Sequence, residues 1–355
     1  MSKTNKKSLI YAVFFAAALG LAVFVFFSRG KVLTFGNQKD LEQQKETANI
    51  VSSVQADGVS PFTSLACEHH DRRPLAVMIS GDSVARPLSG LSSADLVINM
   101  PVITDSITRL MAVYVCEDPQ EIGSIRSART DYIPFVEEWK AIYGHWGGSH
   151  FALDKLKTGV VSDLDALTDL GGAYFRKAGI PMPHNGFTSM PRLLKAANKL
   201  GYSLTNQTKE FFPHLTSDQD RCQAQDCSTK KILSIGFPGS FKVEYKYDPS
   251  VNAYYRWRGN TPEMDANNNR QVEVKVVAII KTDSHQIEGQ YNEVDVIGSG
   301  AGTIYQNGLA IEGKWQKNSE TALLRFLQEN GEPILLVPGK IWIEVVQTNQ
   351  KVDWQ

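Results

Sequence analysis

Short apolar runs separated by polar turns characterise the chain after residue 70. Residues 75–79, 96–100 and 110–115 are mostly apolar and predict buried strands. Helices are predicted between and after these strands. Apolar residues at helical spacing predict one over residues 131–143, and a capped stretch that runs over residues 191–200 to Gly201 predicts another. Strands mixed with helices of this length predict an α/β or α+β unit that ends near residue 205.

The pattern changes beyond residue 231, where apolar and polar residues alternate. Residues 241–247 and 272–276 alternate as half-buried strands do, and residues 254–257 are aromatic. Asn307-Gly308 and Asn330-Gly331 each separate two apolar runs and predict hairpin turns. No cluster of titratable residues is evident in this part. We therefore predict an α+β fold in which a mixed α/β domain precedes a β-rich domain that closes at residues 341–346.

The N-terminus carries the most apolar segment of the chain. Residues 9–27 contain 19 residues without a charge, and at about 1.5 Å per residue they nearly span a hydrocarbon core of roughly 30 Å. Lysines precede this segment at positions 3, 6 and 7, which favours a cytoplasmic N-terminus. We predict a single-pass anchor in the lipid bilayer with an extracytoplasmic body; a cleaved signal peptide is the alternative. No cysteine closely follows the segment, which argues against an acylated lipoprotein.

Composition shifts divide the chain into six parts. The prediction is a cytoplasmic N-terminus at 1–8, the transmembrane anchor at 9–27, an extracytoplasmic linker at 28–68, an α/β domain at 69–205, a connecting segment at 206–231 and a β-rich domain at 232–347. A net charge of -1 argues against nucleic-acid binding.

Four cysteines fit an oxidising compartment. Cys222 and Cys227 are candidates for one disulfide and Cys67 and Cys116 for another, while free thiols remain the alternative. Cys67 with His69 and His70 has the ligand types of a zinc site, but no second ligand pair is suitably spaced. We predict neither a metal nor a cofactor.

Arginine, histidine and glycine alternate with apolar runs between Thr108 and Asn185. Such a composition is typical of a concave anion or amide site. If Ser127 opens a helix, Arg126 and Arg129 project from neighbouring faces of its first turn. The alternative is that they pair with internal acids such as Asp95 or Asp154. The candidate ligand-binding residues are Arg109, Arg126, Arg129, Gly147, Gly148, Ser149, His184 and Asn185.

His184 is also the candidate general base, because prolines on its N-terminal side restrict the backbone that carries it. Ser149, His184 and Asp154 include the residue types of a hydrolase. A loop histidine satisfied by backbone hydrogen bonds is the alternative.

Several separated motifs resemble the DUF3048 family, the YerB-like bacterial cell-envelope proteins. They include Arg73-Pro-Leu-Ala-Val-Met-Ile79, Ile125-Arg-Ser-Ala-Arg129, Pro183-His-Asn185 and, near the C-terminus, Tyr305-Gln-Asn-Gly308. The resemblance covers about residues 70–347 and implies an exported or anchored protein without an agreed biochemical function. This chain departs from the family pattern at Val102–Ser106, where a glutamate and two glycines are usual, and at Ser124, where a proline is usual.

The expected function is therefore an envelope protein that binds an anionic or amide-bearing ligand, such as a cell-wall polymer, or a protein partner. The alternative is an envelope hydrolase or transferase with His184 as general base. The loss of the family glutamate makes binding the preferred interpretation.

Overall fold

The computed structural model describes residues 58–206, 208–216 and 231–355. The predicted anchor at residues 9–27, nearly all of the predicted linker, and the cysteines Cys222 and Cys227 lie outside these residues. Within the described part of the chain, no helix combines the length and apolarity that crossing a membrane requires.

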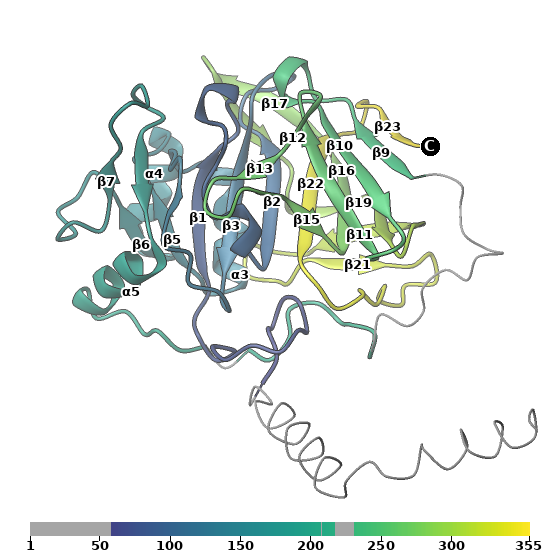
Figure 1. Ribbon diagram of the computed structural model, residues 1–355, viewed down its shortest axis with the longest axis horizontal. Helices are drawn as coiled ribbons and strands as arrows, with labels where there is room; N and C mark the ends of the chain where they lie inside the picture. Colours follow the sequence, from purple (N-terminus) through teal and green to yellow (C-terminus); the bar gives the residue numbers. More distant parts are fainter. Residues whose placement is uncertain (1–57, 207, 217–230) are drawn as a thin grey trace, which may run out of the picture. The chain divides into compact units, whose positions relative to one another are not determined.

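One sheet of ten strands forms the centre of the described structure (Figure 1), in the order β21-β20-β19-β16-β22-β2-β3-β1-β5-β6. Its strands are β1 (Leu75–Ser80), β2 (Leu96–Pro101), β3 (Thr108–Tyr114), β5 (Ile142–His145), β6 (Ser162–Asp165), β16 (Val276–Thr282), β19 (Gly298–Gln306), β20 (Leu309–Lys317), β21 (Arg325–Leu327) and β22 (Ile341–Gln347). β1, β5 and β6 run parallel, and β22 is parallel to both β2 and β16. Both predicted domains therefore contribute strands to one sheet, and they meet where β2 pairs with β22. The predicted domain boundaries stay a prediction.

A second, six-stranded sheet has the path β12-β11-β10-β9-β23, with β15 paired to β11. Its strands are β9 (Ile232–Ile235), β10 (Val243–Asp248), β11 (Ala253–Arg258), β12 (Thr261–Pro262), β15 (Glu273–Val274) and β23 (Val352–Trp354). Smaller pairings join β4 (Ile122–Gly123), β7 (Phe175–Arg176) and β8 (Gly186–Thr188), then β13 (Met264–Asp265) with β14 (Arg270–Gln271), and β17 (Ser284–Glu288) with β18 (Tyr291–Val294). The fold is thus mixed but mostly β.

The central strands are buried on both faces, which explains their continuous apolar sequences. Along β1, Leu75, Val77 and Ile79 belong to a core shared with the six-stranded sheet. Ala76 and Met78, on the opposite face, belong to a second core shared with the short helix α3 (Ile133–Glu138). The predicted strands at 75–79, 96–100 and 110–115 are confirmed as β1, β2 and β3.

The other helices of the described residues are α4 (His150–Lys157) and α5 (Met190–Lys199), with single 3₁₀ turns at Ser83–Ala85, Leu91–Ser93, Thr130–Tyr132 and Gly239–Phe241. The helix predicted at 191–200 is confirmed as α5, and Gly201 follows it with φ +73°. The prediction for 131–143 is wrong in its C-terminal half. Lys140 has φ +51°, which ends the helix, and Tyr143 lies in β5 instead.

In the β-rich part, the hairpin at Asn307-Gly308 is confirmed between β19 and β20, with positive φ at both turn residues. The turn at Asn330-Gly331 is present, but only an isolated bridge, between Leu327 and Pro333, pairs the chain on its two sides. Tyr254 is fully buried, as its place in a strand core requires.

A disulfide joins Cys67, ahead of β1, to Cys116, just after β3. This bond ties the entry segment of the body to the end of a central strand. The Cys67 sulfur is therefore not available as a zinc ligand.

Candidate functional site

The candidate site lies where the parallel strands β1 and β5 end. The segment after β4 crosses this edge: the Ser80 amide donates to the Ser124 carbonyl over 2.9 Å, and the Arg126 amide donates to the Met78 carbonyl over 2.9 Å. The Trp146 amide, just beyond β5, donates to the Arg126 carbonyl over 3.0 Å. Arg126 is thereby held between two strand ends, and the carboxyl edge of parallel strands is the usual place for a ligand site in α/β sheets.

Asp82 is the residue around which two of the predicted site residues, Arg126 and His184, gather. Its Oδ2 atom lies 3.8 Å from Arg126 Nη2 and 3.8 Å from His184 Nδ1. The Ser80 hydroxyl donates to the same oxygen over 2.8 Å. We call Ser80, Asp82, Arg126 and His184 the Asp82 cluster. It brings together a carboxylate, a guanidinium and an imidazole from three separate segments.

The Asp82 cluster keeps unused hydrogen-bonding capacity. Arg126 Nε, His184 Nδ1 and the nearby Ser124 hydroxyl are buried and have no hydrogen-bond partner in the described structure. The Arg126 and His184 side chains are still 18% and 14% exposed. Buried polar atoms are almost always satisfied, so these donors indicate a place where a ligand or solvent completes the site.

Electrostatics favours an uncharged His184. Burial lowers the pKa of His184, the positive charge of Arg126 lowers this pKa further, and Asp82 opposes both. At neutral pH the imidazole therefore has one donor and one acceptor nitrogen. Arg126 remains the cation of the cluster.

Arg109 lies behind the cluster rather than in it. It is paired with Ser80 in the β1–β3 register, and its Nη1 atom donates to the Ser127 carbonyl over 2.8 Å. Burial lowers the pKa of Arg109 to about 9, with contributions from Arg129 and Arg126. Through its hydrogen bond to Ser127, Arg109 holds the segment at residues 124–127 in place, and it adds positive charge near Arg126.

Arg129 takes a different direction from Arg126. The segment between them is extended, and a helical turn starts only at Thr130, so the helical placement of the two arginines is wrong. Arg129 Nη1 donates to the Ala128 carbonyl over 3.1 Å, and its guanidinium lies 5.3 Å from the ring centre of Tyr291. The structure does not bring Arg129 to Asp82.

The internal acids proposed as alternative partners of the arginines have other contacts. Asp95 accepts hydrogen bonds from the Ser60 hydroxyl and the Val115 amide, and Asp154 pairs with Lys157. The ion-pair interpretation therefore holds for Arg126 only, with Asp82 as the acid.

The residues of the Gly147–Ser149 turn make hydrogen bonds and a β-bridge within the protein. Gly147, at φ +61°, accepts a hydrogen bond from the Ala128 amide over 2.8 Å and donates to Asp165 over 2.8 Å. The neighbouring Gly148 forms an isolated bridge with Ala128. Ser149 is the N-cap of α4, and its hydroxyl accepts from the Ala152 amide over 3.2 Å. These contacts give the three residues local structural roles.

The hydrolase combination Ser149, His184 and Asp154 is therefore not assembled. Ser149 caps a helix, Asp154 pairs with Lys157, and His184 faces Asp82. Asn185 accepts a hydrogen bond from Arg176 over 2.7 Å, within the β7–β8 hairpin. Of the predicted ligand-binding residues, the structure brings Arg126 and His184 together.

Sequence reasoning missed Asp82 and Ser80. The available signal was an acid three residues beyond the buried strand predicted at 75–79, a position from which a side chain can reach the carboxyl edge of a sheet.

His145, at the end of β5, is a fully buried histidine with both ring nitrogens engaged. Its Nε2 atom contacts Asp163, and its Nδ1 atom lies 2.9 Å from the Gly147 carbonyl. Residues 58–206, 208–216 and 231–355 contain no group of three or more metal-binding side chains. The donor set of the Asp82 cluster points instead to hydrogen-bonded and charged ligands.

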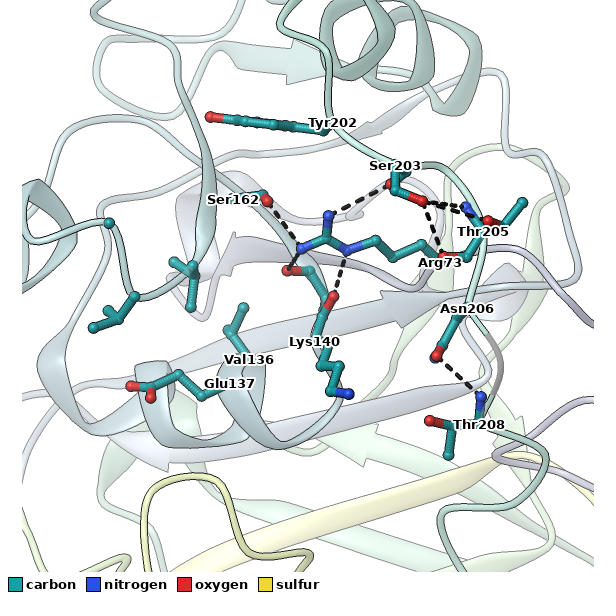
Figure 2. A pocket seen from close by; sticks show the side chains of 14 residues that line it. Arg73, Val136, Glu137, Lys140, Ser162, Tyr202, Ser203, Thr205, Asn206 and Thr208 are labelled. Atoms are coloured by element: carbon teal, nitrogen blue, oxygen red, sulfur yellow. Dashed lines mark hydrogen bonds between the residues drawn. The ribbon is translucent and has the colours of Figure 1, made fainter.

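A cavity of about 910 Å³ lies at the opposite, amino edge of the same strands (Figure 2). Arg73 crosses it and donates to the Ser162 hydroxyl over 2.9 Å and to the backbone carbonyl of Lys140. The ring of Tyr202 lies on the other side of the guanidinium from Glu137. None of the predicted site residues lines this cavity, so its arginine serves mainly to join backbone segments.

Comparison with known proteins identifies the family of this chain. The N-terminal domain of the DUF3048 family, described as a protein of unknown function, matches residues 62–203, and the C-terminal domain of the same family matches residues 233–343. The chain belongs to the DUF3048 family. The resemblance inferred from the motifs is thus confirmed.

A relative in Bacillus subtilis (strain 168), named "Putative lipoprotein YerB", is 29% identical over 314 residues, which cover 84% of this chain and 91% of the relative. The crystal structure of the YerB protein from Bacillus subtilis resembles this structure with a TM-score of 0.74 and 27% sequence identity. The match covers 83% of this chain and 99% of that one.

Proposed function

We propose that this protein is held at the outer face of the bacterial cytoplasmic membrane and binds an anionic, amide-bearing envelope ligand at the Asp82 cluster. The name of the YerB relative supports a location outside the cytoplasm, and the uncharged residues 9–27 supply the anchor. A lipid-modified cysteine is a poorer anchor for this chain. The first cysteine is Cys67, which is bonded to Cys116.

The observation that carries the binding proposal is the convergence of Arg126 and His184 on Asp82 with buried, unpartnered nitrogens. Arg126 offers a fork of donors to a carboxylate. Neutral His184 and the Asp82 carboxylate accept hydrogen bonds from amide N–H groups. A ligand with both a carboxylate and an amide, such as a cell-wall peptide, matches this set of donors and acceptors.

Catalysis with His184 as general base is the weaker alternative. Among the described residues, no hydroxyl or thiol makes a hydrogen bond with His184, so a nucleophile is not positioned beside it. The geometry therefore supports binding better than hydrolysis.

The test is a calorimetric titration of the full-length protein with muropeptides, which are soluble cell-wall fragments bearing carboxylates and amides. Arg126→Gln and His184→Gln should each weaken binding roughly tenfold, the effect of losing one charge-assisted or buried hydrogen bond. His150→Gln is the matched control, because His150 is an exposed histidine paired with Glu288.

Equal weakening in the control, or no binding by the wild type, would refute the proposal. Cleavage of the muropeptides that His184→Gln abolishes would favour the hydrolase instead.

A further inference from the structure

Helix α5, which is labelled in Figure 1, carries a row of cations that do not belong to the Asp82 cluster. Arg192, Lys195 and Lys199 are spaced three and four residues apart, so they lie on one face of the helix. All three side chains are exposed, whereas Leu193 and Ala197 face the core. None of the three forms an ion pair with another residue of the described chain.

This row lines a cavity of about 670 Å³ between α5 and the loop at residues 170–173. Its lining includes the three cations, the α5 N-cap residue Ser189 and the two glycines Gly171 and Gly172, and it contains no aspartate or glutamate. The lining therefore carries only positive charge, and Asp169, next to the loop, accepts a hydrogen bond from the Gly171 amide over 3.0 Å. The Asp82 cluster differs, because there an internal acid already faces Arg126.

The cations and the glycine loop lie close together. Arg192 donates to the Gly172 carbonyl, and its guanidinium lies 5.0 Å from the ring centre of Phe175. A Cβ atom on Gly171 would lie 3.4 Å from Lys199 Nζ, so this ammonium group rests against the loop backbone. Both glycines have positive φ, 63° and 79°, a conformation that other residues rarely adopt.

We propose that this cavity binds a compact anion with two or more linked phosphate groups. The backbone positions of successive cations are about 4.5 and 6 Å apart along the helix axis, so the three together extend over a longer stretch than a single phosphate occupies. Linked phosphates place several charges and many acceptor oxygens in a small volume, and Arg192, held by Gly172 and Phe175, is pre-positioned for one of them. A diphosphate or a short phosphate chain fits this arrangement.

The experiment titrates the full-length protein with inorganic pyrophosphate, tripolyphosphate and orthophosphate, and with monomeric dihexanoyl phosphatidylglycerol as the lipid-headgroup source. Pyrophosphate and tripolyphosphate should bind at one site, more tightly than orthophosphate. Each of Arg192→Gln, Lys195→Gln and Lys199→Gln should weaken binding about tenfold, and the triple variant should abolish it.

The matched control is Arg270→Gln with Lys314→Gln and Lys351→Gln, which removes three exposed cations elsewhere. An equal loss in this control would show that only net charge matters and would overturn the proposal. So would binding of phosphatidylglycerol without binding of pyrophosphate, or no binding of any linked phosphate. Arg126→Gln leaves α5 intact and should not change pyrophosphate binding, so this proposal and the muropeptide proposal fail separately.

Discussion

Arg256 Nη2 donates to Glu344 Oε1 over 3.0 Å, and both side chains are completely buried. Arg256 belongs to β11 of the six-stranded sheet and Glu344 to β22 of the ten-stranded sheet. Tyr245 donates to the same Glu344 oxygen over 2.7 Å, and Asn99 donates to the other oxygen over 2.7 Å. The ion pair thus joins the two sheets within their shared core.

This network corrects one expectation from the sequence, namely that the β-rich part has no cluster of titratable residues. Arg256, Arg258, Glu263 and Glu344 are all buried there, and Arg256 contacts both glutamates. Arg256, Arg258 and Glu263 lie within eight residues of one another, whereas Glu344 is more than 80 residues away and meets Arg256 only because the two sheets pack together.

Glu344→Gln should lower the free energy of unfolding by about 3 to 5 kcal/mol, because it leaves the buried Arg256 charge without one of its two acidic partners. Urea unfolding followed by tryptophan fluorescence measures this change. Glu312→Gln, on the exposed face of β20, is the control and should alter stability by less than about 0.5 kcal/mol. A similar effect of both variants would show that the Arg256–Glu344 pair does not hold the sheets together.

Asp131 should make stability depend on pH. Burial raises the pKa of Asp131 to about 7, although the Val294 amide opposes the shift. The folded state therefore binds more protons than the unfolded state between about pH 4 and pH 7, and stability from this residue is lost as pH rises through that range.

Asp131→Asn removes the titrating group and keeps an acceptor for Val294. The free energy of unfolding of the variant minus that of the wild type should increase when the pH is raised from 5 to 8. Urea unfolding at both pH values measures this difference. Parallel pH profiles of the two proteins would contradict the assignment.

Ser149→Ala should lower the free energy of unfolding by about 1 kcal/mol, the usual cost of losing a helix N-cap. It should leave muropeptide affinity unchanged, whereas Arg126→Gln should weaken that affinity with little loss of stability. Thermal unfolding and calorimetry on the same preparations separate the two roles. Weaker binding by Ser149→Ala at unchanged stability would place Ser149 in the site after all.

The elements that were predicted well share a local cause. The runs that became β1, β2 and β3 are apolar throughout because these strands are buried on both faces. Asn307-Gly308 specifies its hairpin because both residues tolerate positive φ. The helix predicted over residues 131–143 failed only in its C-terminal half, because β1 recruits Ile142 and Tyr143 into the sheet, a pairing that helical periodicity does not reveal.

The sequence predicted two members of the Asp82 cluster, Arg126 and His184, but not Asp82 itself, because proximity in space cannot be read from residue type. Arg126 and His184 stood out by residue type, but their common partner Asp82 lies more than 40 residues from Arg126 and about 100 from His184 in the sequence. Arg129 and Asn185 have the same chemistry and were equally good candidates. Their extended segment and hairpin turn them toward Tyr291 and Arg176 instead.

The sequence by itself determined the family, the central strands and the apolar N-terminal segment, because each depends on residues close together along the chain. Tertiary structure decided which charges meet. Asp82 joins Arg126 and His184 only because β1, the crossing segment and the β7–β8 hairpin end at one edge of the sheet. Coulombic and hydrogen-bond energies depend on distance in space and not on separation along the chain.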